Sequence, residues 1–230
     1  MSHEATQKVS DSQPGNRPHV VLASGSPRRR EILTRLGITF DVVPPDIDES
    51  PHPGERPESL ATRLAQEKAQ AVAERLGSEE KRPVLAADTI VVLDNDILGK
   101  PRDAEHARQM LGRMTGRTHR VVTGVAVIDP PSFRCWSEAV SSEVEMRAAD
   151  PQSIADYVDT GEPLDKAGSY GVQGEGGRRF VSEVRGSVSN VMGLPRRETL
   201  ALLEKATREA RSPSVTASSL KAAPKDLGGE

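Results

Sequence analysis

Three consecutive arginines, Arg28, Arg29 and Arg30, lie where the sequence predicts the first turn of a helix. The apolar residues 20–23 indicate a short buried strand before them, and Pro27 is typical of a first helical position. Because a helix N-terminus carries partial positive charge, each arginine there costs up to about 1 kcal/mol unless an anion neutralises it. A phosphate would accept hydrogen bonds from the backbone N–H groups and the guanidinium groups together. The pattern favours a phosphate site, with a solvated basic helix start as the alternative.

Two charged residues, Asp88 and Lys68, lie in segments that are otherwise apolar. Asp88, followed by Thr89, interrupts the most hydrophobic segment of the chain, residues 84–93. A buried carboxylate needs a metal ion, a cation or strong donors as its partner, and the alternative is a strand end that faces water. Lys68 falls on the apolar stripe of a predicted helix at residues 57–76, where an apolar residue is expected. The alternative to a functional role is that its apolar stem carries the ammonium out to water.

Three further polar residues lie in predicted loops. Lys100 follows Gly99, which lets the chain pass close to a ligand, although a surface lysine beside a turn fits equally well. Glu49 belongs to a short acidic loop of a kind that is usually only solvated. Gln173 lies in a glycine-rich segment, residues 165–174, that matches no Walker loop or dinucleotide fingerprint. Its amide both donates and accepts, so it could read a base edge or be an ordinary loop glutamine.

Together these side chains fit one substrate chemistry. The arginines and lysines would neutralise a polyphosphate. The isolated carboxylates would hold Mg²⁺, which usually binds one or two carboxylates plus substrate phosphates. No Cys–His or Ser–His pair is evident in the sequence, so a water molecule is the expected nucleophile.

The composition excludes several other classes of protein. The 230 residues carry a net charge of −3 and 3% aromatic residues, which argues against nucleic-acid binding by bulk charge or base stacking. A single cysteine, Cys135, forms no intrachain disulfide and fits a reducing compartment. No apolar run approaches the roughly 20 residues of a membrane span, and the N-terminus lacks the apolar core of a secretion signal. We therefore expect a cytoplasmic protein, and the scattered histidines predict no zinc site.

Strand and helix patterns interleave along the chain, with one long hairpin, so we expect an α/β protein with a mixed sheet flanked by helices. Polar ends at residues 1–17 and 211–230 predict flexible tails around a single domain at residues 18–210. Ser26 is the expected N-cap of the first helix, and Asp103 of a later one. The predicted strands cover residues 20–23, 38–43, 84–93, 97–99, 120–128, 133–146 and 179–184, and the predicted helices cover residues 27–36, 57–76, 104–111, 151–158 and 195–210.

Several motifs, in this order, resemble the Maf family of nucleoside triphosphate pyrophosphatases over roughly residues 19–205. They read Leu22-Ala23-Ser24-Gly25-Ser26-Pro27-Arg28-Arg29, Ala87-Asp88-Thr89, Gly99-Lys100-Pro101, and Pro163-Leu164-Asp165-Lys166-Ala167-Gly168 through Gln173-Gly174. The resemblance implies a two-lobed α/β fold with a mixed sheet around a central cleft, similar to the inosine-triphosphate pyrophosphatases. It also implies hydrolysis of a nucleoside triphosphate to the monophosphate and pyrophosphate with a divalent metal ion, Mg²⁺ or Mn²⁺.

The resemblance also implies roles for individual residues. The family's proton acceptor falls on Asp88, which would also hold the metal ion with help from Glu49. Its other cleft residues fall on Ser24, Arg29, Glu49, Lys68 and Lys100, of which Arg29, Lys68 and Lys100 would stabilise phosphate charge. The residues associated with dTTP and UTP selection match Arg28, Thr89 and Gln173, which favours a pyrimidine substrate. Water would attack the α-phosphorus.

Other functions stay open at this point. One is a house-cleaning pyrophosphatase for 7-methyl-GTP or another modified nucleotide. Another is a nucleotide- or RNA-binding regulator of cell division without turnover, although the charge and the scarce aromatic residues count against RNA. A homodimer is also open, and the sequence gives no sign of a membrane partner.

Overall fold

A seven-stranded mixed sheet forms the centre of the structure, a computed structural model that describes residues 18–211. The strand order is β2-β1-β3-β5-β6-β7, and β4 pairs with β3. β1 pairs in parallel with β2 and β3, and the other pairs are antiparallel. The strands are β1 His19–Leu22, β2 Thr39–Val42, β3 Val84–Leu93, β4 Asp96–Leu98, β5 Thr118–Asp129, β6 Arg134–Met146 and β7 Val181–Arg185. The predicted mixed sheet is therefore confirmed.

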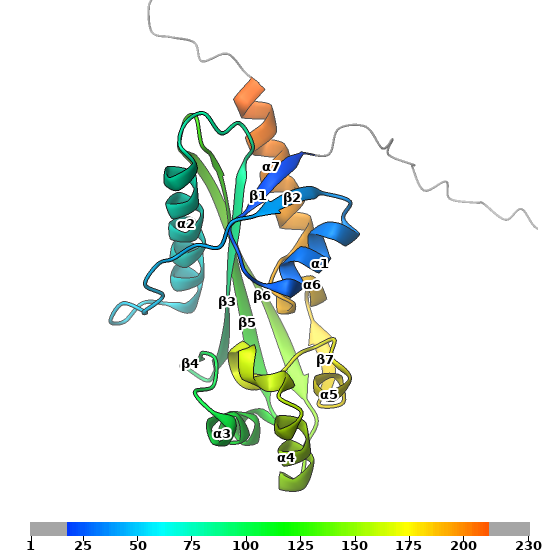
Figure 1. Ribbon diagram of the computed structural model, residues 1–230. Helices are drawn as coiled ribbons and strands as arrows, with labels where there is room; N and C mark the ends of the chain where they lie inside the picture. The colour runs from blue at the N-terminus through cyan, green and yellow to red at the C-terminus, as the bar shows by residue number, and fades with distance from the viewer. Residues whose placement is uncertain (1–17, 212–230) are drawn as a thin grey trace, which may run out of the picture.

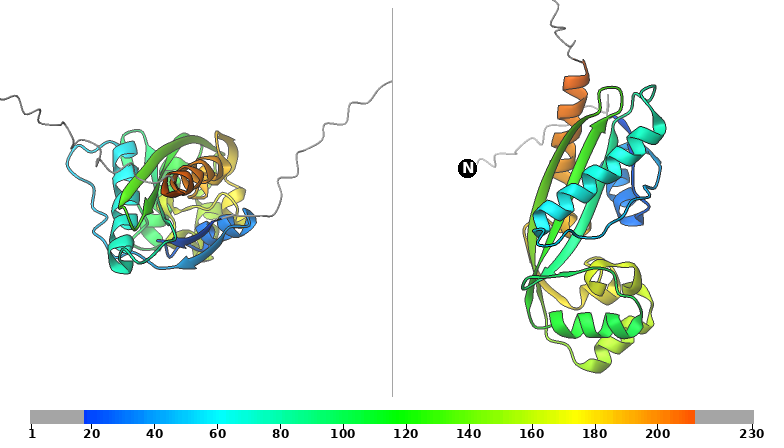
Figure 2. Two further views of the ribbon diagram at one scale, coloured as in Figure 1. Left: turned by 90° about the horizontal axis from the view of Figure 1, so that it is seen from above. Right: turned by 90° about the vertical axis from the view of Figure 1, so that its left-hand side faces the viewer.

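Helices cover the sheet in two groups along the long strands β5 and β6 (Figures 1 and 2). α1, α2 and α7 lie toward one end of these strands, and α3, α4 and α5 lie toward the other. A cleft between the two groups stays a prediction. The helices are α1 Pro27–Arg35, α2 Pro57–Leu76, α3 Ala104–Met114, α4 Pro151–Asp159, α5 Glu175–Arg178, α6 Val188–Val191 and α7 Arg196–Arg211, with 3-10 turns η1 Glu162–Asp165 and η2 Ala167–Ser169. Within residues 18–211, no helix has the length and apolar character needed to cross a membrane.

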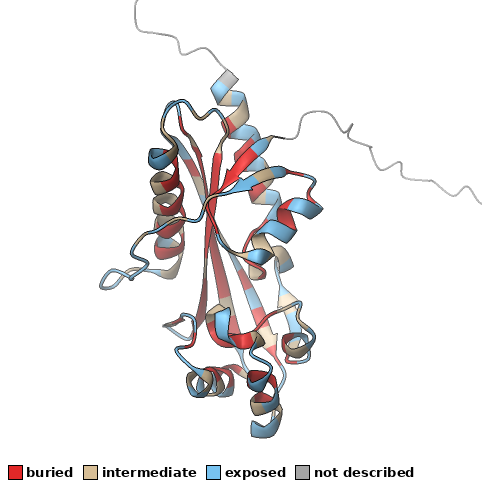
Figure 3. Cartoon of the chain, viewed as in Figure 1, coloured by how far each residue is buried: buried red, intermediate tan, exposed pale blue. Residues whose placement is uncertain are grey.

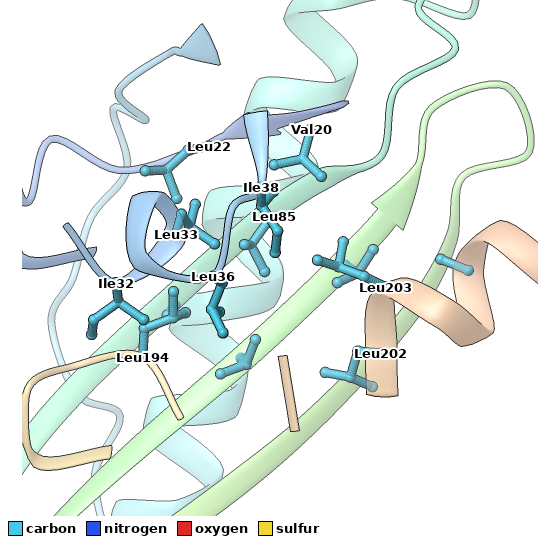
Figure 4. Close-up of a cluster of buried hydrophobic side chains, with 14 of the residues drawn as sticks. Val20, Leu22, Ile32, Leu33, Leu36, Ile38, Leu85, Leu194, Leu202 and Leu203 are labelled. Carbon is cyan, nitrogen blue, oxygen red and sulfur yellow. The ribbon is translucent and has the colours of Figure 1, made fainter. Parts of the chain in front are cut away.

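β3 is buried on both faces, which explains its nearly continuous apolar sequence (Figure 3). Val84 and Ala86 pack in a cluster with residues of α2. Leu85 and Ala87 point to the opposite face, where Leu85 lies near Leu33 and Ile38 (Figure 4). Successive side chains of a strand alternate between its faces, so this pattern also decides where the polar residues of β3 point.

Most of the predicted elements are confirmed, with small differences at their ends. α2 has the predicted bounds, and Asp103 caps α3 by accepting a hydrogen bond from the His106 backbone N–H at 2.7 Å. Ser26 is at the N-cap position of α1, but its side chain makes no capping hydrogen bond. Instead its backbone N–H donates to Ser24 Oγ at 3.2 Å. Arg211 is still part of α7, and the rest of the two predicted tails lies outside the described residues.

The backbone of α2 lies directly over the sheet at Gly124 of β5. A Cβ atom added at Gly124 would lie 2.1 Å from the Ala61 carbonyl oxygen of α2, well inside any real contact. Gly124 is also the cross-strand partner of Asp88. A residue without a side chain is therefore required at the point where the helix backbone lies over the sheet.

Gly124→Ala should lower the free energy of unfolding by about 3 kcal/mol, because the added methyl group meets helix backbone that cannot move aside cheaply. Urea denaturation measures the change. Gly112→Ala is the control, since a Cβ at Gly112 in α3 meets nothing within 4 Å. It should raise stability by about 0.5–1 kcal/mol. Equal effects of the two substitutions would contradict the close approach.

A buried polar pair joins the start of β5 to the residue that follows η2. The His119 Nε2 atom is 2.7 Å from the Tyr170 hydroxyl, and the two rings meet edge to face. The His119 side chain is buried, and its Nδ1 atom has no hydrogen-bond partner among the described residues. Burial lowers the pKa of His119 to about 4, so the imidazole stays neutral in the folded protein at pH values where it is protonated in the unfolded chain.

This pair predicts an acid-dependent loss of stability. The unfolded chain protonates His119 below about pH 6.5, whereas the folded protein does so only near pH 4. The unfolded state therefore binds more protons between these values, and the free energy of unfolding falls as the pH falls, by up to about 3 kcal/mol. Denaturation of wild type and His119→Gln between pH 7 and pH 4 should show this loss only in wild type. The exposed His52→Gln should behave as wild type, and an equal loss in His119→Gln would assign the effect to other groups.

Candidate active site

The polar residues of β3 lie where one edge of this strand has no neighbouring strand. On that edge, β1 pairs with Val84 and Leu85, and β4 pairs with residues 91–93. Between them, residues 86–90 pair only with β5 on the opposite edge, as far as the described residues show. Asp88 points toward α2 and Thr89 toward the other face, so this gap in the sheet presents polar groups on both sides.

On the α2 face, the Lys68 ammonium lies between two carboxylates. Its Nζ atom is 2.6 Å from Asp88 Oδ1 and 2.8 Å from Glu49 Oε1. The side chains of Lys68 and Asp88 are 7% and 11% exposed, whereas that of Glu49 is 58% exposed. Lys68 therefore does not reach out to water, and Asp88 is not a solvated strand end. The structure brings together three of the residues that the sequence singled out, from a loop, a helix and a strand.

On the opposite face, Arg29 turns inward and donates to three acceptors. Its Nη1 atom donates to Ser24 Oγ at 2.9 Å, Nη2 to Thr89 Oγ1 at 3.3 Å, and Nε to the Gly193 carbonyl at 2.9 Å. Burial lowers the pKa of Arg29, while the charge of Asp88 raises it, which places the two faces of the site within electrostatic reach of each other. Arg29 is thus half-buried and held by hydrogen bonds to the protein, whereas Arg30 is exposed.

The remaining predicted site residues lie outside these contacts. Lys100 and Gln173 are exposed, and neither has a hydrogen bond or ion pair within residues 18–211. Lys100 lines a hollow of about 510 Å³ that none of the residues contacting Lys68 or Arg29 lines. A hydrogen bond of 3.0 Å from the Gly168 N–H to the Gly99 carbonyl ties its loop to the glycine-rich segment.

Arg28 is half-buried beside that same segment. Burial raises the pKa of Asp165, but a hydrogen bond from Lys166 and the charges of Lys166 and Arg28 together hold it below its usual value. Arg28 is thus close to residues of the glycine-rich segment, and within residues 18–211 it has no hydrogen bond or ion pair to Asp88 or Lys68.

Two residues of this site, Thr123 and Gly193, carry no signal in the sequence. Thr123 lies opposite Thr89 in the β3–β5 ladder, so its place depends on a strand register that local patterns do not give. Gly193 has φ of 104°, a conformation that favours glycine, and its carbonyl accepts from Arg29.

A divalent metal ion fits the donor atoms of Asp88 and Glu49. Both carboxylates approach one cation, the Lys68 ammonium, so their oxygens already converge. Within the described residues, no cluster of three or more His, Cys, Asp or Glu side chains could hold a metal ion. Two carboxylates completed by substrate phosphates are the arrangement that Mg²⁺ commonly uses, so the residues present are compatible with the expected ion.

Comparisons with known proteins agree on the family. The family model described as Maf-like protein matches residues 19–206. A dTTP/UTP pyrophosphatase of Anaeromyxobacter dehalogenans (strain 2CP-C) is 52% identical over 191 residues, which cover 82% of this chain and 94% of that protein. A protein of the same name from Myxococcus xanthus (strain DK1622) is 52% identical over 187 residues, 81% of this chain and 92% of the relative. The chain belongs to the Maf family, as its motifs predicted.

More distant relatives agree in name. A dTTP/UTP pyrophosphatase of Escherichia coli O6:K15:H31 (strain 536 / UPEC) is 48% identical over 192 residues, 83% of this chain and 95% of that protein. Among solved structures, that of the Staphylococcus aureus Ham1 protein matches 83% of this chain and 98% of its own with 14% identity. Its TM-score is 0.39.

Lys68→Met should destabilise the protein by about 3 kcal/mol at neutral pH, because it leaves the buried Asp88 carboxylate without its cation. In an Asp88→Asn background the same change should cost much less, and the difference measures the coupling between the two charges. Chemical denaturation of the four proteins gives this cycle. Glu49→Gln is the control and should cost under about 1 kcal/mol, since Glu49 is largely exposed. Additive effects of the Lys68 and Asp88 changes would contradict a buried ion pair.

Proposed function

We propose that this protein hydrolyses dTTP and UTP to the nucleoside monophosphate and pyrophosphate. The observation that supports this most strongly is the convergence of Glu49, Lys68 and Asp88 within electrostatic reach of Arg29. The chain in which they converge is about half identical to proteins named dTTP/UTP pyrophosphatase. Cations, paired carboxylates and a half-buried arginine at a helix N-terminus suit a triphosphate–metal complex better than any neutral substrate.

In this proposal, Asp88 is the base that accepts a proton from the attacking water. Lys68 donates to Asp88 Oδ1, and Oδ2 has no hydrogen bond to any other described residue, so Oδ2 is the atom we assign to this proton. The water oxygen forms a bond to the α-phosphorus as the bond between that phosphorus and the bridging oxygen breaks. Pyrophosphate carries that oxygen away. A general base of this kind typically contributes on the order of 100- to 10,000-fold to the rate.

The cations act on the phosphate groups. Arg29, Lys68 and Lys100 would stabilise the charge that spreads over the phosphate oxygens in the transition state, since phosphoryl transfer depends mainly on positioning and electrostatics. Asp88 and Glu49 would hold Mg²⁺ or Mn²⁺, which when bound neutralises phosphate charge and makes its water more acidic. Ser24 would bind the phosphate groups of the substrate together with the backbone N–H groups at the start of α1.

Substrate selection is assigned to Arg28, Thr89 and Gln173. Gln173 is exposed, and its amide is free to pair with the edge of a nucleobase that enters beside the glycine-rich segment.

We further propose a cytoplasmic location, in keeping with the single cysteine, and leave a homodimer as the alternative to a monomer. A panel of canonical and modified nucleotides, assayed for pyrophosphate with Mg²⁺ and Mn²⁺, tests the substrate assignment. Preference for 7-methyl-GTP, or no release with any nucleotide, would overturn it.

Asp88→Asn should lower the turnover of dTTP on the order of 1,000-fold while the protein stays folded, because asparagine cannot accept the proton from water. Pyrophosphate release and circular dichroism, measured on the same samples, check both statements. Asp159→Asn is the matched control, since this carboxylate pairs with Arg108 on the surface away from the site. It should retain wild-type turnover. A near-normal rate in Asp88→Asn would remove Asp88 from the mechanism.

A further inference from the structure

A closed circuit of hydrogen bonds joins Arg29 and Thr89 to three residues that no sequence motif singled out, Thr123, Asn190 and Gly193. Arg29 Nη2 donates to Thr89 Oγ1, which lies 3.0 Å from Thr123 Oγ1, and Thr123 Oγ1 is 3.0 Å from the Asn190 carbonyl. The Gly193 N–H donates to the same carbonyl at 2.8 Å. Arg29 Nε then donates to the Gly193 carbonyl and completes the circuit. α1, β3, β5, α6 and the turn after α6 all meet in it.

The direction of each hydrogen bond in this circuit follows from counting protons. A carbonyl oxygen has no proton, so Thr123 must donate to Asn190. A hydroxyl group has one proton, so Thr123 can only accept from Thr89. Thr89 therefore spends its own proton on Thr123 and accepts from Arg29. No hydroxyl proton of Thr89 is left for a nucleotide, and only one of its lone pairs remains.

Thr123 and Asn190, the members of the circuit farthest along the hydrogen bonds from Arg29, are held in place by the sheet. Thr123 and Asn190 are fully buried. The Asn190 side chain donates through Nδ2 to the Val121 carbonyl at 3.0 Å and to Ser142 Oγ at 2.9 Å, which ties α6 to β5 and β6. The carbonyl that accepts from Thr123 is thus fixed to the sheet, and the chain of donors that ends on it has one low-energy arrangement.

We propose that Thr123 is a positioning residue that fixes the guanidinium group of Arg29 through Thr89. Without the Thr123 hydroxyl, Thr89 loses its acceptor and is free to rotate or to donate elsewhere, so Arg29 loses one of its three anchors. Thr89 in turn acts by holding Arg29 and by accepting hydrogen bonds. It does not donate a hydrogen bond to the nucleobase of the substrate. The effect on catalysis rests on the proposed function, whereas the effect on Arg29 itself does not.

The test compares Thr123→Val, which has nearly the same shape but no hydroxyl, with Thr123→Ser, which keeps the hydroxyl. In ¹⁵N-labelled protein, the Nε–H signal of Arg29, assigned by its loss in Arg29→Lys, should exchange slowly with water in wild type and Thr123→Ser. In Thr123→Val its exchange should be at least about tenfold faster. Thr199→Val controls for loss of a buried hydroxyl, because Thr199 is buried and its Oγ1 has no hydrogen-bond partner among the described residues. It should leave the signal unchanged.

Kinetics on dTTP give the second readout. Thr123→Val should lower kcat/KM roughly 10- to 100-fold, mainly through kcat, because a misplaced Arg29 stabilises the transition state less well. Thr123→Ser should stay within about threefold of wild type. In a Thr89→Val background, Thr123→Val should cause no further loss, since the link is already broken.

Each outcome separates the two proposals. Unchanged Nε–H exchange in Thr123→Val, or losses that multiply in the double variant, would overturn the positioning role. If wild type releases pyrophosphate from no nucleotide, the proposed function fails. The exchange measurement still decides in that case whether Thr123 fixes Arg29.

Discussion

The structure depends on one buried contact, the ammonium of Lys68 against the carboxylate of Asp88. Neither charge tolerates burial alone, so helix and sheet must bring both to the same point. Gly124, opposite Asp88 in the ladder, allows this by leaving room for the backbone of α2 at Ala61. The distance between α2 and the sheet is therefore set at the site itself. The ion pair and the close packing of Ala61 against Gly124 both require this same distance.

The interruption in the sheet gives this constraint its chemical use. β1 and β4 leave a stretch of β3 uncovered on one edge, and the polar residues of β3 lie within that stretch. The carboxylates of Asp88 and Glu49 lie on the α2 face of the sheet, and the hydrogen-bonded guanidinium of Arg29 lies on the other face. A phosphate chain beside this edge would meet both sets of groups, which a continuous sheet would separate. In the proposed function, the gap would let the loop at Glu49, α2, β3 and α1 present their polar residues to one substrate.

The sequence predicts the elements well because their signals are local. The apolar stripe and closing glycine define α2, and alternation defines the long strands. Asp88 and Lys68 were predictable as site residues because each is a charge in an apolar pattern. Thr123 was not, since its role comes from the register between β3 and β5. Gly193 acts through its carbonyl, which has no side-chain signal, and Ser26 has the predicted position without the predicted bond. Lys100 and Gln173 were singled out by the glycines beside them and then by the family motifs, but local patterns do not show where their loops lie relative to Asp88.

Alternation along β3 has a consequence for how this protein can evolve. Asp88 and Thr89 are neighbours in the chain but serve opposite faces, each with its own partner across the sheet. With Leu85 held by β1, insertion or deletion of a single residue between Leu85 and Asp88 would turn the carboxylate toward Arg29 and the threonine toward α2. A single substitution in this stretch changes one side chain, whereas a change in length turns every following side chain to the opposite face of the sheet. We therefore expect the number of residues in this stretch to be invariant among working relatives, even where their identities drift.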